Sequence, residues 1–310
     1  MYSDRAILVS VCVCTYRRTE LLIGLLESLV AQTLPHENFE VIVVENDQAA
    51  AAQNEVKRFA AAHPSLCVRY AVEPQQGISF ARNRTVNMAS GEYLAFIDDD
   101  EAAAPAWLAH MLDCLHQFGS DAVFGPVIPV FPPGTPAWIV QSHFFDRQRY
   151  QTGTTLGWGD GRTCNALVTT SMARKRLPVT FEPRLARSGG EDTDFFKWLT
   201  GQGGLMTWCD DAIVSELVPA QRQTLRYILA RSLRSSVVFW RETYAGRTAS
   251  WRYKRALVGL VGACLFGLAG LAAFPLGLGP VARAWSRSMK LLGRAAALGR
   301  GEYVGYGGTV

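Results

Sequence analysis

Several features that would place this 310-residue chain in other protein classes are missing from its sequence. It has no CxxC pair, no internal repeat and no low-complexity tract, and its seven cysteines are an odd number lying largely in apolar runs. This pattern is typical of reduced, buried thiols in a cytosolic protein and argues against a zinc site or a disulfide framework. The formal net charge of +4 is too small to indicate nucleic-acid binding.

The N-terminus also lacks the features of a secretory signal. Its first apolar run, residues 7–14, starts almost at once, and no small-residue cleavage site follows it. We therefore expect this run to form a strand and the catalytic part of the chain to stay in the cytoplasm. The length allows one large domain or two modest ones.

Short β-rich apolar runs alternate with helical patterns through the first hundred residues. This alternation predicts an α/β fold, a mostly parallel sheet with right-handed crossovers and helices on both faces. Thr19 stands where it would cap the first helix. The expected strands are 7–14, 39–44, 66–72 and 93–97, and the expected helices are 19–31, 50–62, 79–89 and, later, 191–199.

Polar residues follow three of these strands directly. In open parallel sheets ligands bind beyond the carboxyl ends of the strands, so these residues are candidates for one site. They are Thr15-Tyr16-Arg17, Glu45-Asn46-Asp47 and Asp98-Asp99-Asp100.

The acidic run Asp98-Asp99-Asp100-Glu101 has the strongest chemical signal. Four adjacent acids repel one another unless they are solvated or neutralised by a cation. A bare acidic run is usually a solvated loop, but its place at the end of a buried strand favours a metal or ligand role. Asp98 and Asp100 would point the same way across a turn and share a hydrated Mg²⁺ or Mn²⁺.

Loops dominate residues 121–180, which are rich in proline and, at 153–161, in glycine. Such stretches usually form variable substrate pockets. Trp158, Asn165 and Arg187 are candidate sugar or acceptor contacts, although a loop aromatic packing on the core would account equally well for Trp158.

Five motifs resemble those of the family 2 glycosyltransferases with the GT-A (Rossmann-like) fold, within which the chain is similar to succinoglycan-biosynthesis glucosyltransferases. Each motif alone is weak, but their order and spacing over residues 7–225 are specific. They are VCVCTYRR (11–18), VIVVEND (41–47), GISFARN (77–83), YLAFIDDD (93–100) and GGEDTD (189–194).

The resemblance implies a nucleotide-sugar donor, with Thr15, Glu45 and Arg82 lining the base pocket. A carboxylate there would accept a hydrogen bond from N3–H of uracil. The family usually has Asp where Glu45 stands, and Asp47 is the alternative. Arg17 would assist the diphosphate or be an ordinary surface arginine.

The resemblance further implies that Asp98 binds the ribose hydroxyls and Asp100 the metal, with Asp99 in the donor site but without a settled role. The metal would neutralise charge on the departing nucleoside diphosphate. Many relatives add a late histidine, but the last one here is His143. Glu216 is the ligand available in its place, or an ordinary surface glutamate.

Asp192 is the expected catalytic base, because the Glu-Asp motif of the family falls there and an inverting transfer needs one base near the acceptor hydroxyl. Glu191 would help to place the donor or acceptor. Asp194 is a third acid in this turn, and simple capping of a helix N-terminus is an alternative for all three.

Residues 256–278 carry no charge, would span about 34 Å as a helix, and have basic residues on both sides. A single span would carry the basic tail out of the cytoplasm, against the positive-inside tendency. A re-entrant or interfacial segment at an anionic membrane surface avoids this. A buried soluble helix or an oligomer contact through the C-terminal region is the remaining alternative.

The sequence thus predicts a catalytic domain at 1–225 and a basic, apolar helical region at 226–310. We expect an inverting, metal-dependent hexosyltransferase that uses a UDP-sugar and a lipid-linked saccharide acceptor at the cytoplasmic face of the inner membrane, for a surface polysaccharide or exopolysaccharide. A nucleotidyltransferase would need a glycine-rich loop where residues 15–18 stand. An inactive membrane scaffold is disfavoured by the intact Asp98, Asp100 and Asp192.

Overall fold

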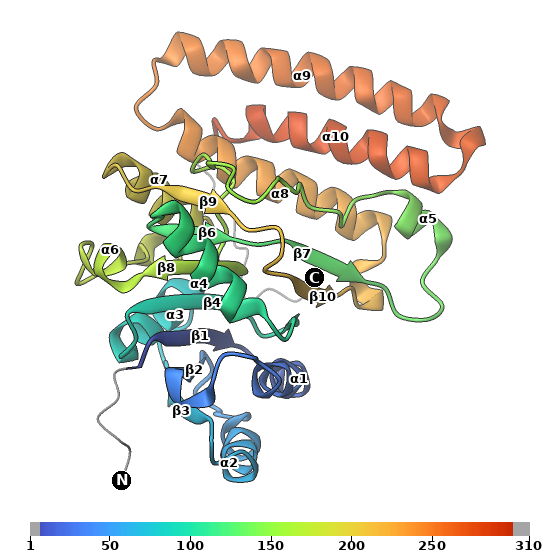
Figure 1. The fold of residues 1–310 in the computed structure, drawn as a ribbon. Helices are drawn as coiled ribbons and strands as arrows, with labels where there is room; N and C mark the ends of the chain where they lie inside the picture. Colours follow the sequence, from blue (N-terminus) through green and yellow to red (C-terminus); the bar gives the residue numbers. More distant parts are fainter. Residues whose placement is uncertain (1–6, 300–310) are drawn as a thin grey trace. The chain divides into compact units, whose positions relative to one another are not determined.

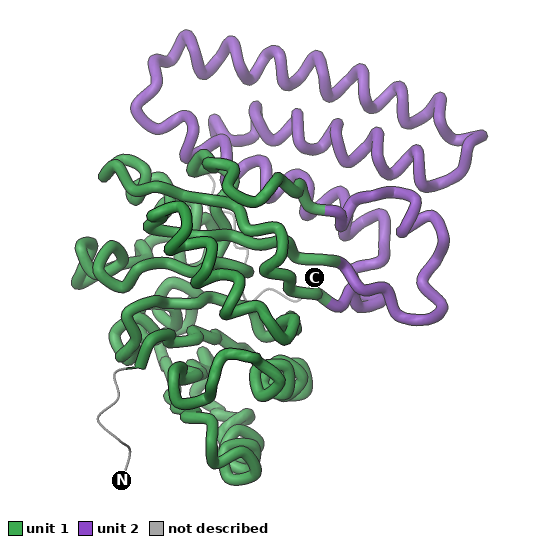
Figure 2. The backbone as a smooth tube through the Cα atoms, viewed as in Figure 1, with its two compact units in different colours: residues 1–128, 147–216 green, residues 129–146, 217–310 purple. Residues whose placement is uncertain are grey.

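The computed structural model describes residues 7–299, and its contacts divide the chain into two compact units (Figure 2). The first comprises residues 1–128 and 147–216, and the second residues 129–146 and 217–310. The expected domain boundary at 225/226 stays a prediction, and residues 300–310 of the C-terminal region lie outside the described residues.

The first unit contains a seven-stranded sheet with the strand order β3-β2-β1-β4-β8-β6-β9 (Figure 1). The strands β3, β2, β1 and β4 run parallel, β8 is antiparallel to β4 and β6, and β6 is parallel to β9. The predicted mostly parallel sheet is confirmed. The strands are β1 (Val9–Thr15), β2 (Phe39–Glu45), β3 (Cys67–Val72), β4 (Tyr93–Asp98), β6 (Ala122–Phe124), β8 (Asn165–Thr169) and β9 (Met206–Trp208).

Helices cover both faces of this sheet because successive strand residues point to opposite sides. Val11 and Val13 pack in one core with α1, α2 and α4, whereas Cys12 and Ile42 pack in a second core with α3, α6 and α7. The predicted cap at Thr19 is wrong: Arg18 holds that position and makes no side-chain capping bond. The helices are α1 (Thr19–Val30), α2 (Gln53–Ala62), α3 (Ile78–Met88), α4 (Trp107–Phe118), α6 (Thr170–Arg174) and α7 (Glu191–Gly201).

A smaller sheet, in the order β5-β10-β7, contains the end of the acidic run. Its strands are β5 (Glu101–Ala103), β10 (Val214–Leu217) and β7 (Val127–Val130). β5 and β10 are antiparallel, and Glu101 stands opposite Glu216 in their register. This pairing brings two acids together that lie far apart in the sequence.

The second unit is helical. Within it α10 (Leu278–Ala296) packs against both α8 (Leu225–Tyr244) and α9 (Ala249–Ala272), and the short α5 (Ala137–Gln141) also contacts α10. The uncharged segment 256–278 is not one helix: α9 ends at Ala272, a 3₁₀ turn covers Phe274–Leu276, and α10 begins at Leu278. Within residues 7–299, α9 alone is long and apolar enough to cross a membrane.

Candidate active site

The acidic run occupies the turn between β4 and β5 and is held against the end of β1. The hydroxyl of Thr15 donates a hydrogen bond to Asp99 (2.8 Å), and Arg18 donates to Asp99 (3.1 Å) and Asp100 (3.2 Å). Asp99 is 5% exposed, whereas the side chain of Asp98 is 44% exposed. Asp99 is therefore the buried anchor of the turn, and Asp98 is the acid open to a ligand.

Arg82, on α3, joins the acidic run to the start of α7. Its guanidinium lies 3.6 Å from the carboxylate of Asp98 and donates a hydrogen bond to Glu191. Both Arg82 and Glu191 are buried. The structure thus brings together three residues that the sequence assigned to donor and acceptor binding.

Burial raises the pKa of Glu191 to about 7, against the opposing effect of Arg82. One of its carboxylate oxygens has no hydrogen-bond partner. A buried carboxyl with an unused oxygen is a strong acceptor or donor for a polar ligand group.

Two consecutive glycines form the turn that leads into α7. Gly189 has φ of 79° and Gly190 φ of 95°, a left-handed backbone that side-chain-bearing residues rarely adopt. Asp192 follows in the first turn, where its carboxylate accepts a hydrogen bond from the backbone N–H of Thr193 (2.7 Å). Asp194 is instead paired with Arg176 (2.7 Å), and the role of Asp192 as the base stays a prediction.

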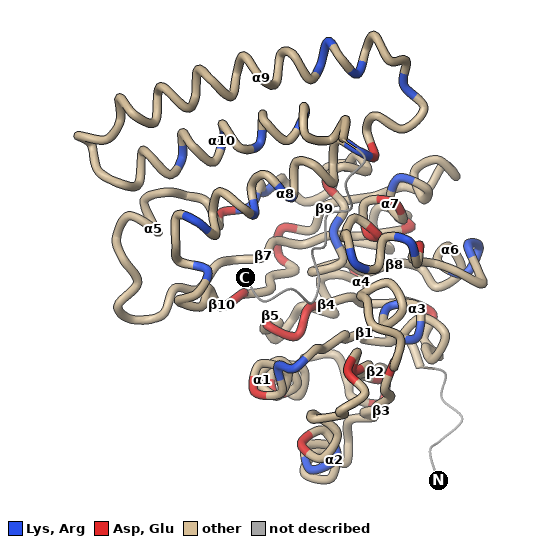
Figure 3. The backbone as a smooth tube through the Cα atoms, turned by 180° about the vertical axis from the view of Figure 1, so that it is seen from behind, with Lys and Arg blue, Asp and Glu red and all other residues tan. Residues whose placement is uncertain are grey.

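Glu101 and Glu216 form the other side of the acidic site. Glu101 accepts a hydrogen bond from the backbone N–H of Asp98 (2.8 Å), its second oxygen has no partner, and burial raises its pKa well above the usual value. Arg147 donates to Glu216 (2.6 Å) and to the sulfur of Cys164 (2.7 Å). Figure 3 shows acidic residues at β5 and β10.

Glu101 and Arg147 have roles that sequence reasoning did not assign. Glu101 was visible as the last acid of the run, but its burial follows from the β5–β10 pairing, which no local pattern indicates. Arg147 stands alone in a loop-rich stretch and carries no sequence signal.

Sequence reasoning also assigned no role to Asn46, which holds the loop before α3. Its amide nitrogen donates to the carbonyls of Glu73 (2.9 Å) and Gln75 (2.8 Å), and its oxygen accepts from the N–H of Gly77 (2.7 Å). Gly77 has φ of 138°, and a Cβ there would lie 2.5 Å from that of Ala186. This fixed loop sets the start of α3 and so the position of Arg82. An asparagine directly after a strand, followed by a loop glycine, was the available signal.

Three predicted donor contacts, Glu45, Arg17 and Asp47, are paired with residues outside the acidic run. Glu45 is 1% exposed; its carboxylate accepts hydrogen bonds from the hydroxyl of Tyr70 and the backbone N–H of Ala52 (3.0 Å). Its role in binding the nucleotide base stays a prediction. Arg17 donates to Asp47 (2.5 Å), which lowers the pKa of Asp47.

The predicted sugar contacts differ in their surroundings. Asn165 is 2% exposed, and its amide bonds Trp107 (2.8 Å) and the carbonyls of Pro126 and Ala212. The amide is thus engaged inside the core in this structure, and a sugar contact at Asn165 stays a prediction. Trp158 is partly buried with Lys197 5.7 Å from its ring centre, and Arg187 is exposed.

The site chemistry suits a hard divalent cation, since its candidate ligand atoms are carboxylate oxygens. Residues 7–299 contain no group of three His, Cys, Asp or Glu side chains arranged around one metal position. Mg²⁺ commonly uses one or two protein carboxylates together with substrate phosphates, so the predicted pair Asp100 and Glu216 has suitable chemistry, and its role as a metal site stays a prediction. Arg18 and Arg147, the present partners of these two carboxylates, already supply positive charge.

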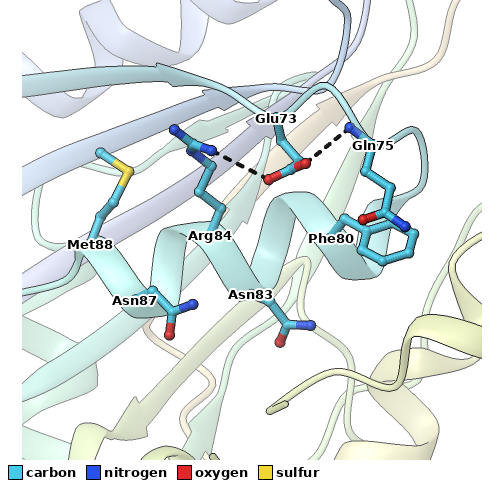
Figure 4. Close-up of a pocket in the computed structure, with 7 residues that line it drawn as sticks. All are labelled: Glu73, Gln75, Phe80, Asn83, Arg84, Asn87 and Met88. Atoms are coloured by element: carbon cyan, nitrogen blue, oxygen red, sulfur yellow. Dashed lines mark hydrogen bonds and ion pairs between the residues drawn. The ribbon is translucent and has the colours of Figure 1, made fainter. Parts of the chain in front are cut away.

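A separate cavity lies on the outer side of α3 (Figure 4). There Glu73 accepts hydrogen bonds from Arg84 (3.5 Å) and from the backbone N–H of Gln75 (2.9 Å). None of the predicted site residues lines it. The acidic turn, not this cavity, gathers the reactive groups.

Comparison with known proteins gives the family. The sequence model of Glycosyl transferase family 2 matches residues 10–177, more than half of the chain. The chain belongs to glycosyl transferase family 2. This membership confirms the resemblance seen in the ordered motifs and sets the nucleotidyltransferase alternative aside.

Relatives within the family include the succinoglycan biosynthesis protein ExoM of Rhizobium meliloti (strain 1021), 35% identical over 233 residues, which are 73% of this chain and 72% of the relative. The glycosyltransferase AglE of Haloferax volcanii is 28% identical over 205 residues, 66% of this chain and 65% of AglE.

Solved structures confirm the GT-A-like fold. The mannosyltransferase PcManGT from Pyrobaculum calidifontis, in complex with GDP-Man and Mn²⁺, has a TM-score of 0.64 and 20% identity over 94% of this chain and 87% of that one. A fragment of TarS from S. aureus, in complex with UDP, has a TM-score of 0.55 and 16% identity over 94% and 91%. At such identities the likeness concerns the fold alone.

Proposed function

We propose that this family 2 glycosyltransferase is an inverting hexosyltransferase that moves a sugar from a nucleotide-sugar donor, a UDP-sugar, to a lipid-linked saccharide. Its product would be a surface polysaccharide or exopolysaccharide. The observation that carries the proposal is the link from Asp98 through Arg82 to Glu191, which joins a donor-binding edge to the Gly-Gly-Glu-Asp turn. The names of ExoM and of the TarS complex with UDP support the choice of pathway and donor.

Donor binding is assigned to the end of the sheet. Asp98, whose side chain is 44% exposed, would accept hydrogen bonds from the ribose hydroxyls; desolvation raises the pKa of its carboxyl to about 6, and Arg82 beside it opposes that rise. Thr15 and Asp99 would fix the turn, with Glu45 or Asp47 accepting from the base and Arg17 near the diphosphate.

Asp100 and Glu216 would hold Mg²⁺ or Mn²⁺, which when bound supplies positive charge against the diphosphate leaving group. Arg18 and Arg147 lie on these two carboxylates and add cationic charge to the same region. The structure of PcManGT, which contains Mn²⁺, supports the use of a divalent cation.

Asp192 would act as the general base. Its carboxylate takes the proton of the acceptor hydroxyl while that oxygen attacks the anomeric carbon and the bond from that carbon to the diphosphate oxygen breaks. Attack from the side opposite the leaving group inverts the anomeric configuration. Glu191 would orient the sugar or acceptor through its unpartnered oxygen, with Trp158 as a stacking surface.

The acceptor would be held at the cytoplasmic face of the plasma membrane. The support is the long apolar helix α9, most of whose surface is exposed, and the cations at its start (Figure 3). A lipid-linked saccharide stays at the bilayer surface, so a membrane-bound enzyme would meet it there.

A donor screen tests this function. Thermal shift and metal-dependent release of nucleoside diphosphate would be measured with UDP-, GDP- and dTDP-sugars, using the wild-type chain and Asp100→Asn. We expect stabilisation and turnover with a UDP-sugar and a marked reduction of both in the variant at the same metal concentration. No response to any nucleotide sugar would refute the proposal.

A further inference from the structure

The outward face of α9 is a continuous apolar surface. Leu257, Leu265, Leu268 and Leu271 recur at helical spacing and are 61–64% exposed. Phe274 and Leu276 in the turn that follows are 65% and 75% exposed. A soluble protein rarely leaves so many large apolar side chains in one stripe without a partner.

The opposite face of α9 is already filled by α10. Added to Gly259, a Cβ would lie 2.6 Å from the carbonyl oxygen of Leu291, and at Gly270 it would meet the ring of Trp285 at 2.1 Å. The hydroxyl of Ser288 donates to the carbonyl of Ala263 (2.7 Å). The small residues of α9, which allow close packing between helices, therefore face α10. The bulky apolar residues on the outward face suit contact with lipid chains better than packing against another helix.

α10 carries cations alongside the middle of α9. The guanidinium of Arg287 lies 5.8 Å from the ring centre of Phe266, and Arg294 packs against Gly259. Arg283 and Lys290 continue the same stripe of α10. If α9 crossed a bilayer, α10 would bring these charges into the hydrocarbon, where an arginine is strongly unfavourable.

The start of α9 has the features of a membrane interface. Trp251 is flanked by the guanidinium groups of Arg247 (5.3 Å) and Arg255 (5.2 Å). Tryptophan and arginine gather at the boundary between headgroups and hydrocarbon, and arginines attract anionic lipids. Figure 3 shows basic residues only at this end of α9 and all along α10.

We infer that α9 lies in the plane of an anionic membrane surface, with its outward leucines and the 274–276 turn in the outer hydrocarbon and the cations of α10 at the headgroups. The inference deepens the proposed function, on which it rests for the presence of a membrane. Of the arrangements open from the sequence it selects an interfacial helix, because α10 packs along α9 and would enter the bilayer with a spanning α9.

Cys264, the exposed cysteine of α9, provides a probe without substitution. The full chain would be labelled there with a fluorophore and mixed with vesicles of phosphatidylglycerol and phosphatidylcholine carrying quenchers at known depths. Parallel samples would carry the label at Leu257→Cys or Leu271→Cys in a Cys264→Ser background. The Cys264→Ser chain alone reports labelling elsewhere.

An in-plane helix predicts the same shallow depth at all three positions, although 257 and 271 are about 21 Å apart along the axis. A spanning helix instead predicts that position 264 is deepest and that 271 is reached by an impermeant quencher from the vesicle lumen. That result would overturn the inference. Cross-linking of two chains through Cys264 in place of vesicle binding would also overturn it.

Flotation with the same vesicles tests the apolar face and the charge. The double variant Leu265→Glu, Leu268→Glu should bind these vesicles roughly tenfold more weakly or worse. The control variant is Leu177→Glu, at a residue of the first unit that is 44% exposed, and its vesicle binding should not change. Binding should also fall when phosphatidylglycerol is omitted; equal binding of all chains to all vesicles contradicts the inference.

The membrane-binding test and the test of the proposed function can fail independently. The flotation assay contains no nucleotide sugar, so a negative result there does not refute the proposed transfer reaction. A negative donor screen likewise does not refute membrane binding.

Discussion

The guanidinium of Arg82 and the carboxylate of Glu191, 109 residues apart in the sequence, form a buried ion pair. Arg82 comes from α3 and Glu191 from the first turn of α7, so the pair ties the donor side of the site to the turn that carries Asp192. Because the two charges share a buried environment, each depends on the other for its solvation.

Removing Arg82 should therefore destabilise the fold strongly. For Arg82→Ala we expect a loss of about 3–5 kcal/mol in the free energy of unfolding, because Glu191 is left buried without its cation. Arg84→Ala is the matched control on the same helix: its side chain is 42% exposed and 3.5 Å from Glu73, so the loss should stay below about 1 kcal/mol. Urea unfolding measures both, and equal losses would contradict the account.

Glu191 should make stability depend on pH. Its pKa is raised to about 7 in the folded protein from an ordinary 4.5, so the folded state binds the proton more tightly than the unfolded chain. Its contribution to stability is full below about pH 4.5 and is lost as the pH rises through about 7. Glu191→Gln cannot titrate, and its melting temperature should vary less between pH 4.5 and 7.5. Parallel curves for variant and wild type would show that another group dominates.

Gly189, in the turn before α7, should contribute to stability and activity through its backbone conformation alone. Gly189 has φ of 79°, and a Cβ there would contact nothing within 4 Å. Gly189→Ala is therefore expected to cost about 1–2 kcal/mol through left-handed strain and to reduce turnover by shifting Asp192.

Gly201→Ala is the control for that change, since Gly201 ends α7 with equally open space and an ordinary φ. It should be neutral or slightly stabilising and leave turnover unchanged. A Gly189→Ala enzyme as stable and active as Gly201→Ala would show that the turn tolerates another backbone.

Metal dependence should be traceable to Asp100. EDTA should abolish donor turnover, and Mn²⁺ or Mg²⁺ should restore it. Asp100→Asn should require a much higher metal concentration for half-maximal activity, because a neutral amide oxygen is a weaker ligand than a carboxylate. Glu73→Gln, at the cavity on α3 away from the acidic turn, should keep the wild-type metal curve. Identical curves for both variants would remove Asp100 from the metal site.

The fold of the first hundred residues could be predicted closely because local periodicity decides it. Val9–Thr15 and Phe39–Glu45 are short, mostly apolar and β-branched runs typical of buried parallel strands, and the helices α1 and α2 that follow them bury apolar side chains at helical spacing. The antiparallel β8 and the β5–β10 pairing could not be predicted, since long-range register leaves no local pattern.

The residues of the candidate site likewise fall into those that local motifs predicted and those whose surroundings depend on tertiary packing. Asp98, Arg82 and Glu191 lie in short motifs next to strand or helix ends, and the structure brings them together. Asn165 stands in an equally polar sequence context, yet its amide joins Trp107 to the chain around Pro126 and is buried. Burial of a single polar side chain depends on tertiary packing, which the sequence near Asn165 does not encode.

The most direct test of the central claim is the activity of Asp192→Asn. Nucleoside diphosphate release would be measured with the donor from the screen and a lipid extract of the organism that encodes the chain, alongside the donor Kd from calorimetry. The account predicts a fall in kcat of about 10²–10⁴-fold with Kd unchanged, because the amide cannot take the acceptor proton. An Asp192→Asn enzyme that keeps most of its turnover while binding donor normally would contradict it.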